Sequence, residues 1–252
     1  SGSYVTGSEI TGDIETEFAY GIQDALLECV AFNPWVDDVL EFGGTTRKTI
    51  SIVKGYTDLN NYHVFTGCHV NTWSLAIATD EIVTSTFGIM GLARKASNTP
   101  PSGEVTPAPN AVAFTALSVG DIKFNDVAVA GQMCVTGLDV TFDNSAQVQK
   151  CLNYENDVGA ILETLLNVSG TANLAWSVGA ADLYEKQFTN TPVSISWKIK
   201  NGAGDAYLIE LPEVLLSMEL PSGASGDILT VDATFTVKDV APRITRIPAE
   251  NP

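Results

Sequence analysis

Apolar and polar residues alternate with a period of two through most of the chain. Valine, isoleucine, threonine and aromatic residues dominate the alternating segments, and turn-forming residues separate them. This spacing is typical of antiparallel strands with one buried face. The segments with the clearest alternation are 49–53, 71–78, 82–90, 193–200, 206–211 and 229–237.

Two segments follow a helical spacing instead. Residues 22–31 and 179–188 place apolar side chains three and four positions apart, which predicts two short amphipathic helices. Glycine, aspartate and asparagine cluster between strand segments and predict hairpin turns. The turn residues that we expect are Gly55, Asp58, Gly202, Gly204 and Asp205. The fold class is therefore expected to be mainly β, with antiparallel strands and short flanking helices.

The two halves of the chain repeat each other at an offset of 158 residues. The matched pairs are Gly12 and Gly170, Phe18 and Trp176, Gly21 and Gly179, and Asp24 and Asp182. With small gaps, the match extends to Tyr62 over Tyr207 and Phe87 over Phe235. Because matched aromatic residues are expected to serve matched cores, we predict four core aromatics: Phe18, Phe87, Trp176 and Phe235.

The repeat predicts two domains. The first spans 1–92, a Pro-rich linker or extended loop spans 93–112, and the second domain spans 113–252. Strand-like segments at 118–125 and 133–144 precede the second copy and have no counterpart before the first. We therefore expect the first domain to lack its N-terminal strands.

The charge balance is strongly acidic. The 252 residues include 30 acidic and 13 basic side chains, a net charge of −17. Such a surface repels phosphates, so tight nucleic-acid binding and anionic membranes are disfavoured. No apolar run approaches the roughly 20 residues that span a bilayer. The four cysteines form no CxxC pair, and we expect them to be reduced thiols.

The candidate chemistry is concentrated in "GYTDLNNYHVFTGCHV" (55–70), which holds both histidines and a cysteine. The second copy has Leu208 where the first has His63, and about Glu213 where it has Cys68. Neighbours in a strand point to opposite faces, and His63 lies far along the strand, so the pattern argues against a catalytic pair of Cys68 with either histidine. No third metal ligand and no nucleotide-binding motif is present. We expect no enzyme activity, no catalytic or metal residue and no cofactor.

Residues 55–91 resemble the major tail tube proteins of long-tailed, non-contractile (siphovirus-type) bacteriophages. The segments 12–28, 114–124, 135–144 and 183–188 continue the resemblance in the same order. The resemblance implies a tail-tube-type β-sandwich whose inner strands join neighbouring subunits into a ring-wide β-barrel. It also implies a structural virion protein of the tail, made in the host cytoplasm. The implied partners are the chain itself, tape measure, terminator and tip proteins, and double-stranded DNA that passes without sticking.

Two tube-like domains per chain suggest a ring of three chains with approximate six-fold symmetry, with a hexamer as the alternative. An acidic lumen would repel DNA phosphates, although the charge could equally serve only to keep the protein dispersed. A second functional class is a β-sandwich binding module on a capsid or tail surface that recognises a host carbohydrate. A hydrolase is poorly supported, since two histidines on one hairpin offer little general-base chemistry.

Overall fold

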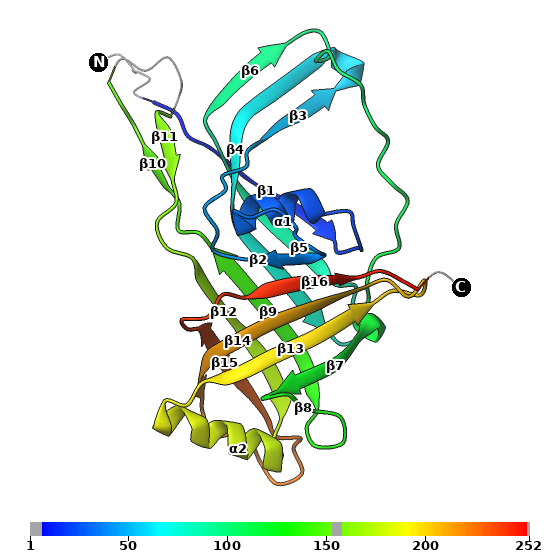
Figure 1. Ribbon diagram of the computed structural model, residues 1–252, viewed down its shortest axis with the longest axis vertical. Coiled ribbons are helices and arrows are strands. Elements are labelled where there is room, and N and C mark those ends of the chain that lie inside the picture. The colour runs from blue at the N-terminus through cyan, green and yellow to red at the C-terminus, as the bar shows by residue number, and fades with distance from the viewer. Residues whose placement is uncertain (1–6, 153–157, 251–252) are drawn as a thin grey trace.

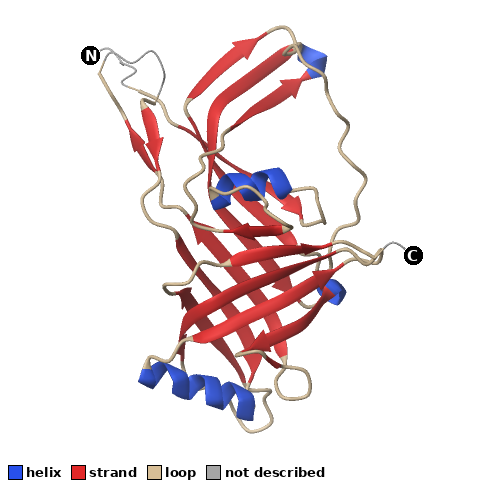
Figure 2. Cartoon of the chain, viewed as in Figure 1, coloured by secondary structure: helices blue, strands red, loops and turns tan. Residues whose placement is uncertain are grey.

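The computed structural model describes residues 7–152 and 158–250 and is dominated by antiparallel strands (Figures 1 and 2). The first six residues of the first predicted domain lie outside the described residues. Strands of the first half are β1 (Ile10–Glu17), β2 (Val39–Glu41), β3 (Ile50–Tyr56), β4 (Asn61–Ala78), β5 (Thr84–Gly91) and β6 (Ala93–Ser97). The helix of this half is α1 (Asp24–Ala31).

The second half has additional strands before its copy. Its strands are β7 (Val119–Phe124), β8 (Val127–Ala128), β9 (Val135–Asp143), β10 (Gln147–Gln149), β11 (Ala160–Leu162), β12 (Asn167–Ala175), β13 (Val193–Lys200), β14 (Ala206–Met218), β15 (Thr230–Val237) and β16 (Arg243–Ile247). Its helix is α2 (Val178–Lys186), and it has 3₁₀ turns at Ala116–Ser118 and Gln187–Thr189. The first half has one 3₁₀ turn among the described residues, Thr57–Leu59, between β3 and β4. The expectation of a mainly β, antiparallel fold with short helices is confirmed.

The repeat is visible in the strand order. In the first copy β1 pairs with β5, β5 with β4 and β4 with β3; in the second, β12 pairs with β15, β15 with β14 and β14 with β13. A further strand, β6 or β16, pairs with the first part of β4 or β14. Residues 93–97, expected to begin the linker, therefore form a strand.

The ladders correct one detail of the repeat alignment. Gly12 lies opposite Ile89, and its counterpart Gly170 lies opposite Phe235. Ile89 is therefore the structural counterpart of Phe235, and Phe87 is not. A slip of two residues leaves every side chain on its own face of the sheet, so the alternating pattern could not reveal it.

Strand β9 joins the two copies into one sheet. It pairs with β4 on one side and with β12 on the other. The resulting order, β1-β5-β4-β9-β12-β15-β14, crosses both copies without a break. The apolar face of this sheet packs into one hydrophobic cluster that includes Trp73, Phe142, Phe18 and Tyr207.

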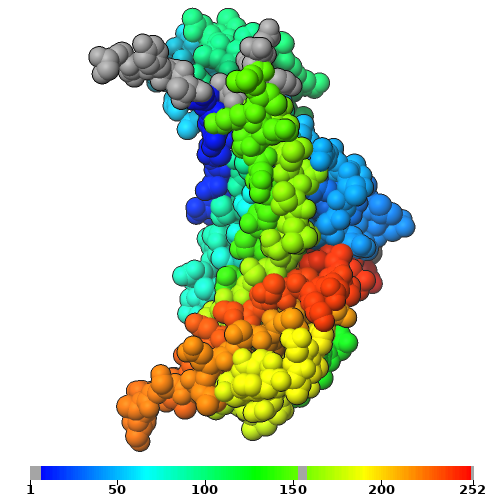
Figure 3. Space-filling model, turned by 90° about the vertical axis from the view of Figure 1, so that its left-hand side faces the viewer, coloured from blue at the N-terminus to red at the C-terminus, as the bar shows by residue number. Residues whose placement is uncertain are grey.

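Two three-stranded units extend from this sheet, and we name them arms. Arm 1 consists of β3, residues 61–68 of β4, and β6; arm 2 consists of β13, residues 206–211 of β14, and β16. Arm 2 crosses over the main sheet beside α1, whereas arm 1 projects from the upper end of the molecule (Figures 1 and 3). The two copies therefore place the same unit in different surroundings.

Candidate functional site

The second face of the main sheet is polar over its whole width. One row of paired residues crosses six strands in the order Glu15, Thr86, Ser74, Thr141, Ser169 and Thr236. A neighbouring row, two residues along each strand, runs Glu17, Thr84, Ala76, Asp139, Thr171 and Thr234. Small hydroxyl-bearing residues thus form a continuous surface on which no large apolar side chain occurs in these two rows.

This surface, which we name the acidic face, carries charge of one sign. Its carboxylates are Asp13, Glu15, Glu17, Asp139, Asp143 and Asp232. The described strands β1, β5, β9, β12 and β15, and residues 69–78 of β4, contain no lysine or arginine. The face therefore presents an anionic field with no cation built into it.

Carboxylates on the acidic face influence one another. Burial raises the pKa of Asp139, and the nearby Asp232 carboxylate raises it further. Asp232 in turn accepts a hydrogen bond of 2.7 Å from the Asn173 side-chain amide. The hydroxyls of Ser74 and Thr141 are 3.1 Å apart across the β4–β9 junction. Side chains from both copies thus meet on one surface.

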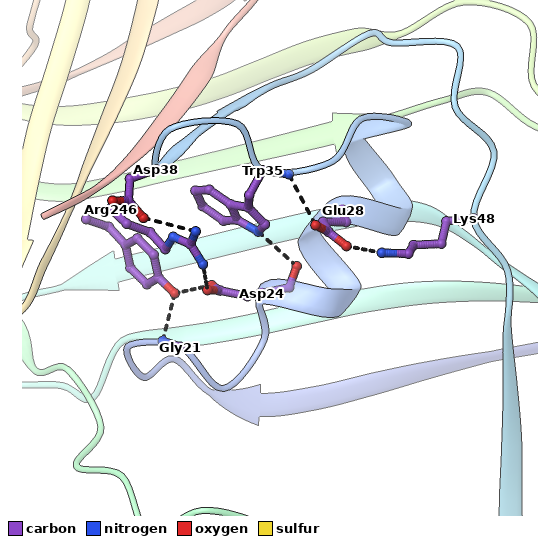
Figure 4. A network of polar contacts seen from close by, with 8 residues as sticks. Gly21, Asp24, Glu28, Trp35, Asp38, Lys48 and Arg246 are labelled. Carbon is purple, nitrogen blue, oxygen red and sulfur yellow. Dashed lines mark hydrogen bonds and ion pairs between the residues drawn. The ribbon is translucent and has the colours of Figure 1, made fainter. Parts of the chain in front are cut away.

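A partly buried polar network fixes α1 of the first copy to arm 2 of the second (Figure 4). The Tyr207 hydroxyl donates a hydrogen bond to the Asp24 carboxylate and accepts one of 2.8 Å from the Gly21 amide. Arg246 donates to the other carboxylate oxygen of Asp24 at 2.9 Å and pairs with Asp38 at 3.0 Å. The Arg246 guanidinium lies 4.4 Å from the centre of the Trp35 ring.

The electrostatics of this network favour its folded arrangement. Burial and the Asp24 carboxylate raise the pKa of Tyr207, so the hydroxyl stays protonated and remains a donor. Burial alone would lower the pKa of Arg246, but Asp24 and Asp38 more than reverse this and raise it. The network ties residues 183 and 222 positions apart in sequence.

We expect Tyr207→Phe to lower the free energy of unfolding by about 1–3 kcal/mol, because it leaves the partly buried Asp24 carboxylate and the Gly21 amide without this partner. The matched control is Tyr62→Phe, at the repeat position in arm 1. No described residue hydrogen-bonds the Tyr62 hydroxyl, so this change should alter monomer stability by less than about 0.5 kcal/mol. Urea unfolding of both variants measures the difference, and equal effects would contradict the role of the network.

The histidines and Cys68 have separate surroundings in the structure. His63 Nδ1 lies 2.9 Å from an Arg94 guanidinium nitrogen, and His69 is buried beside the Gly67 carbonyl. Burial raises the pKa of the Cys68 thiol, which disfavours the nucleophilic thiolate. Among residues 7–152 and 158–250, no group of three or more His, Cys, Asp or Glu side chains is arranged to hold a metal ion.

The structure gives each predicted core aromatic a definite place. Phe18, Phe87 and Phe235 are at most 2% exposed, but Trp176 is only partly buried at the edge of the core. The difference has a physical cause: Tyr207 stacks on Phe18 with ring centres 5.4 Å apart, and within the described chain no such aromatic from another copy covers Trp176.

The predicted turn residues lie at the two arm hairpins. Asp58 is in the 3₁₀ turn after β3, and Gly202, Gly204 and Asp205 separate β13 from β14. Gly55 instead lies within β3, opposite Tyr62. A side chain at this position would collide with the Tyr62 ring, which explains why the residue is glycine. Sequence reasoning missed the acidic face and the residues Trp35 and Arg246. The Thr and Asp residues at alternating positions of β9 and β15 were the available signal for the face.

Comparison with known proteins adds one finding. A family model described as phage tail tube protein matches residues 1–242. A search of curated proteins found no match. No helix within the described residues is long and apolar enough to cross a membrane.

Proposed function

The chain belongs to the phage tail tube protein family, a structural component of the virion tail, and we propose that it assembles into stacked rings whose acidic face lines a DNA-conducting lumen. The observation that carries this proposal is the continuous sheet with one apolar and one acidic face. A sheet of this kind buries its first face in the subunit core and leaves its second for an aqueous bore.

The open edges of the sheet support ring formation. Among the described strands, β1 pairs only with β5, so its outer edge is free. At the other end, residues 215–218 of β14 pair with β15 on one side, and no described strand takes the place beside them that β9 takes beside β4. The Gln187 side-chain amide exchanges two hydrogen bonds with the Met218 backbone at the end of this edge. Unpaired strand edges favour addition of further strands, and head-to-tail addition closes into a ring.

Three chains per ring follow from the duplication in this proposal. Each chain supplies two copies of the same strand order, and six copies then surround the bore with exact three-fold and approximate six-fold symmetry. Rings of six chains are the alternative outcome. Tape measure, terminator and tip proteins are the further partners proposed for the assembled tail.

The acidic face gives the lumen a function of its own. Phosphates passing a surface that carries carboxylates and no cations are repelled, so DNA slides without adhering. Because the screening length is about 8 Å at physiological salt, only charges close to the bore surface act on DNA. The acidic face places six carboxylates of each chain at that surface.

Charge reversal tests this proposal. We expect the triple variant Asp13→Lys, Asp139→Lys and Asp232→Lys to form tubes but to slow or stall DNA release from intact particles, more severely at low salt. The matched control reverses three exposed carboxylates outside the face, Glu104→Lys, Asp126→Lys and Asp227→Lys. Both variants change the net charge equally. Normal release at low salt from the first variant would remove the proposed role of the acidic face.

A further inference from the structure

The groups that form the contact between α1 and arm 2 occur a second time in the chain, where they do not contact one another. Within the chain, the segment around α1 supplies the Asp24 carboxylate and the Gly21 amide, and arm 2 supplies the Tyr207 hydroxyl between them. The repeat supplies counterparts of all three groups: Asp182 and Gly179 in α2, and Tyr62 in arm 1. These counterparts do not contact one another within one chain.

Backbone geometry supports the equivalence of these positions. The Phe18 amide donates to the Val83 carbonyl at 2.9 Å, and the matching Trp176 amide donates to the Leu229 carbonyl at 2.8 Å. Tyr62 is the second residue of β4 and Tyr207 the second of β14, and each pairs with the neighbouring strands on both sides. The strands and arms therefore hold corresponding places in each copy. The helices begin at different points, because Gly21 (φ +76°) precedes α1, which starts at Asp24, whereas Gly179 and Asp182 both lie within α2.

The counterparts are exposed where the originals are covered. Phe18 is fully buried under Tyr207, but Trp176 is only partly buried. Tyr20 packs on Tyr207 with ring centres 4.9 Å apart, whereas Val178, its counterpart by the same offset, is 80% exposed.

The same contrast holds on the arms. Trp197 of arm 2 is fully buried, and Val53, which has its place in the ladder of arm 1, is 48% exposed. Tyr62 itself is only 9% exposed and lies against Gly55, so the contrast does not extend to its ring. Its hydroxyl has no hydrogen-bond partner in the described chain.

The two exposed surfaces lie at opposite ends of the molecule, with arm 1 at the top and α2 at the bottom of Figure 1. A groove of about 570 Å³ runs beside α2 and is lined by Gly179, Asp182 and Phe188, among others. Complementary surfaces at opposite ends of one subunit produce a head-to-tail contact between copies.

We propose that α2 of one chain receives arm 1 of the next chain, with the Tyr62 hydroxyl between the Asp182 carboxylate and the Gly179 amide. The inference rests on the proposed ring and identifies its contact between chains. Lys95 lies on the same face of arm 1 as Tyr62, because it pairs with Val64, which is two residues along β4 from Tyr62. It brings a cation toward a helix that carries Asp182 and Glu185. Ser97 replaces Arg246, so the Asp24–Arg246 ion pair is not repeated.

Cross-linking between single-cysteine chains tests this contact directly. Ser97 and Asp182 occupy the places of Arg246 and Asp24, which touch within one chain. We would prepare Ser97→Cys and Asp182→Cys separately in a Cys134→Ser, Cys151→Ser background, since those two native thiols are the exposed ones. A short bismaleimide should link mixed chains after assembly, whereas either variant alone should give no linked dimer.

A second measurement uses the conservative variants. Tyr62→Phe and Asp182→Asn should each raise the protein concentration needed for half-maximal assembly about tenfold, with unfolding curves of the monomer unchanged. Tubes without Ser97–Asp182 cross-links, together with wild-type assembly of both variants, would overturn this contact and leave the tube proposal standing. A wild-type chain that forms no rings or tubes would overturn both.

Discussion

Phe18→Ala is expected to lower the free energy of unfolding by about 3–5 kcal/mol, a large part of the roughly 5–15 kcal/mol that stabilises a typical protein. Phe18 is fully buried and contacts Trp73, Phe114 and Tyr207, which come from three separate parts of the chain. Its removal leaves a cavity where the first copy meets arm 2. Most of the variant should therefore be insoluble on expression.

The matched control is Tyr56→Ala in arm 1, where the side chain is 43% exposed. This change should reduce stability by less than about 1 kcal/mol. Trp176→Ala should fall between the two, because Trp176 is partly buried. Soluble yield and urea unfolding measure all three. Equal tolerance of Phe18→Ala and Tyr56→Ala would contradict the placement of Phe18 at the centre of the core.

Gly170→Ala is expected to be the second most damaging change, although it adds a single methyl group. A Cβ at this position would lie 2.1 Å from the Asp139 carbonyl oxygen and 2.4 Å from the Phe235 ring. The carbonyl belongs to a paired strand and cannot move without breaking the β9–β12 ladder. Such overpacking costs about 1–3 kcal/mol or more.

Gly12→Ala is the control, since Gly12 holds the matching position in the first copy and a Cβ there meets nothing within 4 Å. Gly12 lies on β1, an edge strand, so no backbone lies where β9 lies beside Gly170. Thermal unfolding should separate the two variants by several degrees. Comparable loss of stability in both would show that the two glycines have equivalent surroundings, against the strand order described above.

The sequence predicted strands, helices and the repeat because these depend on local spacing. The alternation in 193–200 and 229–237 anticipated β13 and β15 almost to the residue, and the glycine clusters anticipated the turn after β13. The family followed from the order of the same segments. These features depend on residues that lie close together in the chain.

Long-range pairing could not be predicted in the same way. Nothing in the local pattern of β9 indicates that it joins β4 to β12, and this junction creates the acidic face. The Asp24, Tyr207 and Arg246 network depends on contacts between distant positions, although the repeat had already marked the first two. Trp176 was expected to be as buried as Phe18, because the two residues match in the repeat. A repeat gives equivalent positions, however, and does not determine which residues cover them. The boundaries 1–92, 93–112 and 113–252 stay a prediction.

The measurement that tests the central claim most directly is electron microscopy of the purified chain, followed by reconstruction of any ring. We expect hollow tubes built from rings of three chains, with the two copies alternating around the bore and Asp13, Asp139 and Asp232 on its wall. Separate, featureless particles at every protein concentration would contradict the tube proposal. A ring with the acidic face turned outward would contradict its proposed role in DNA passage.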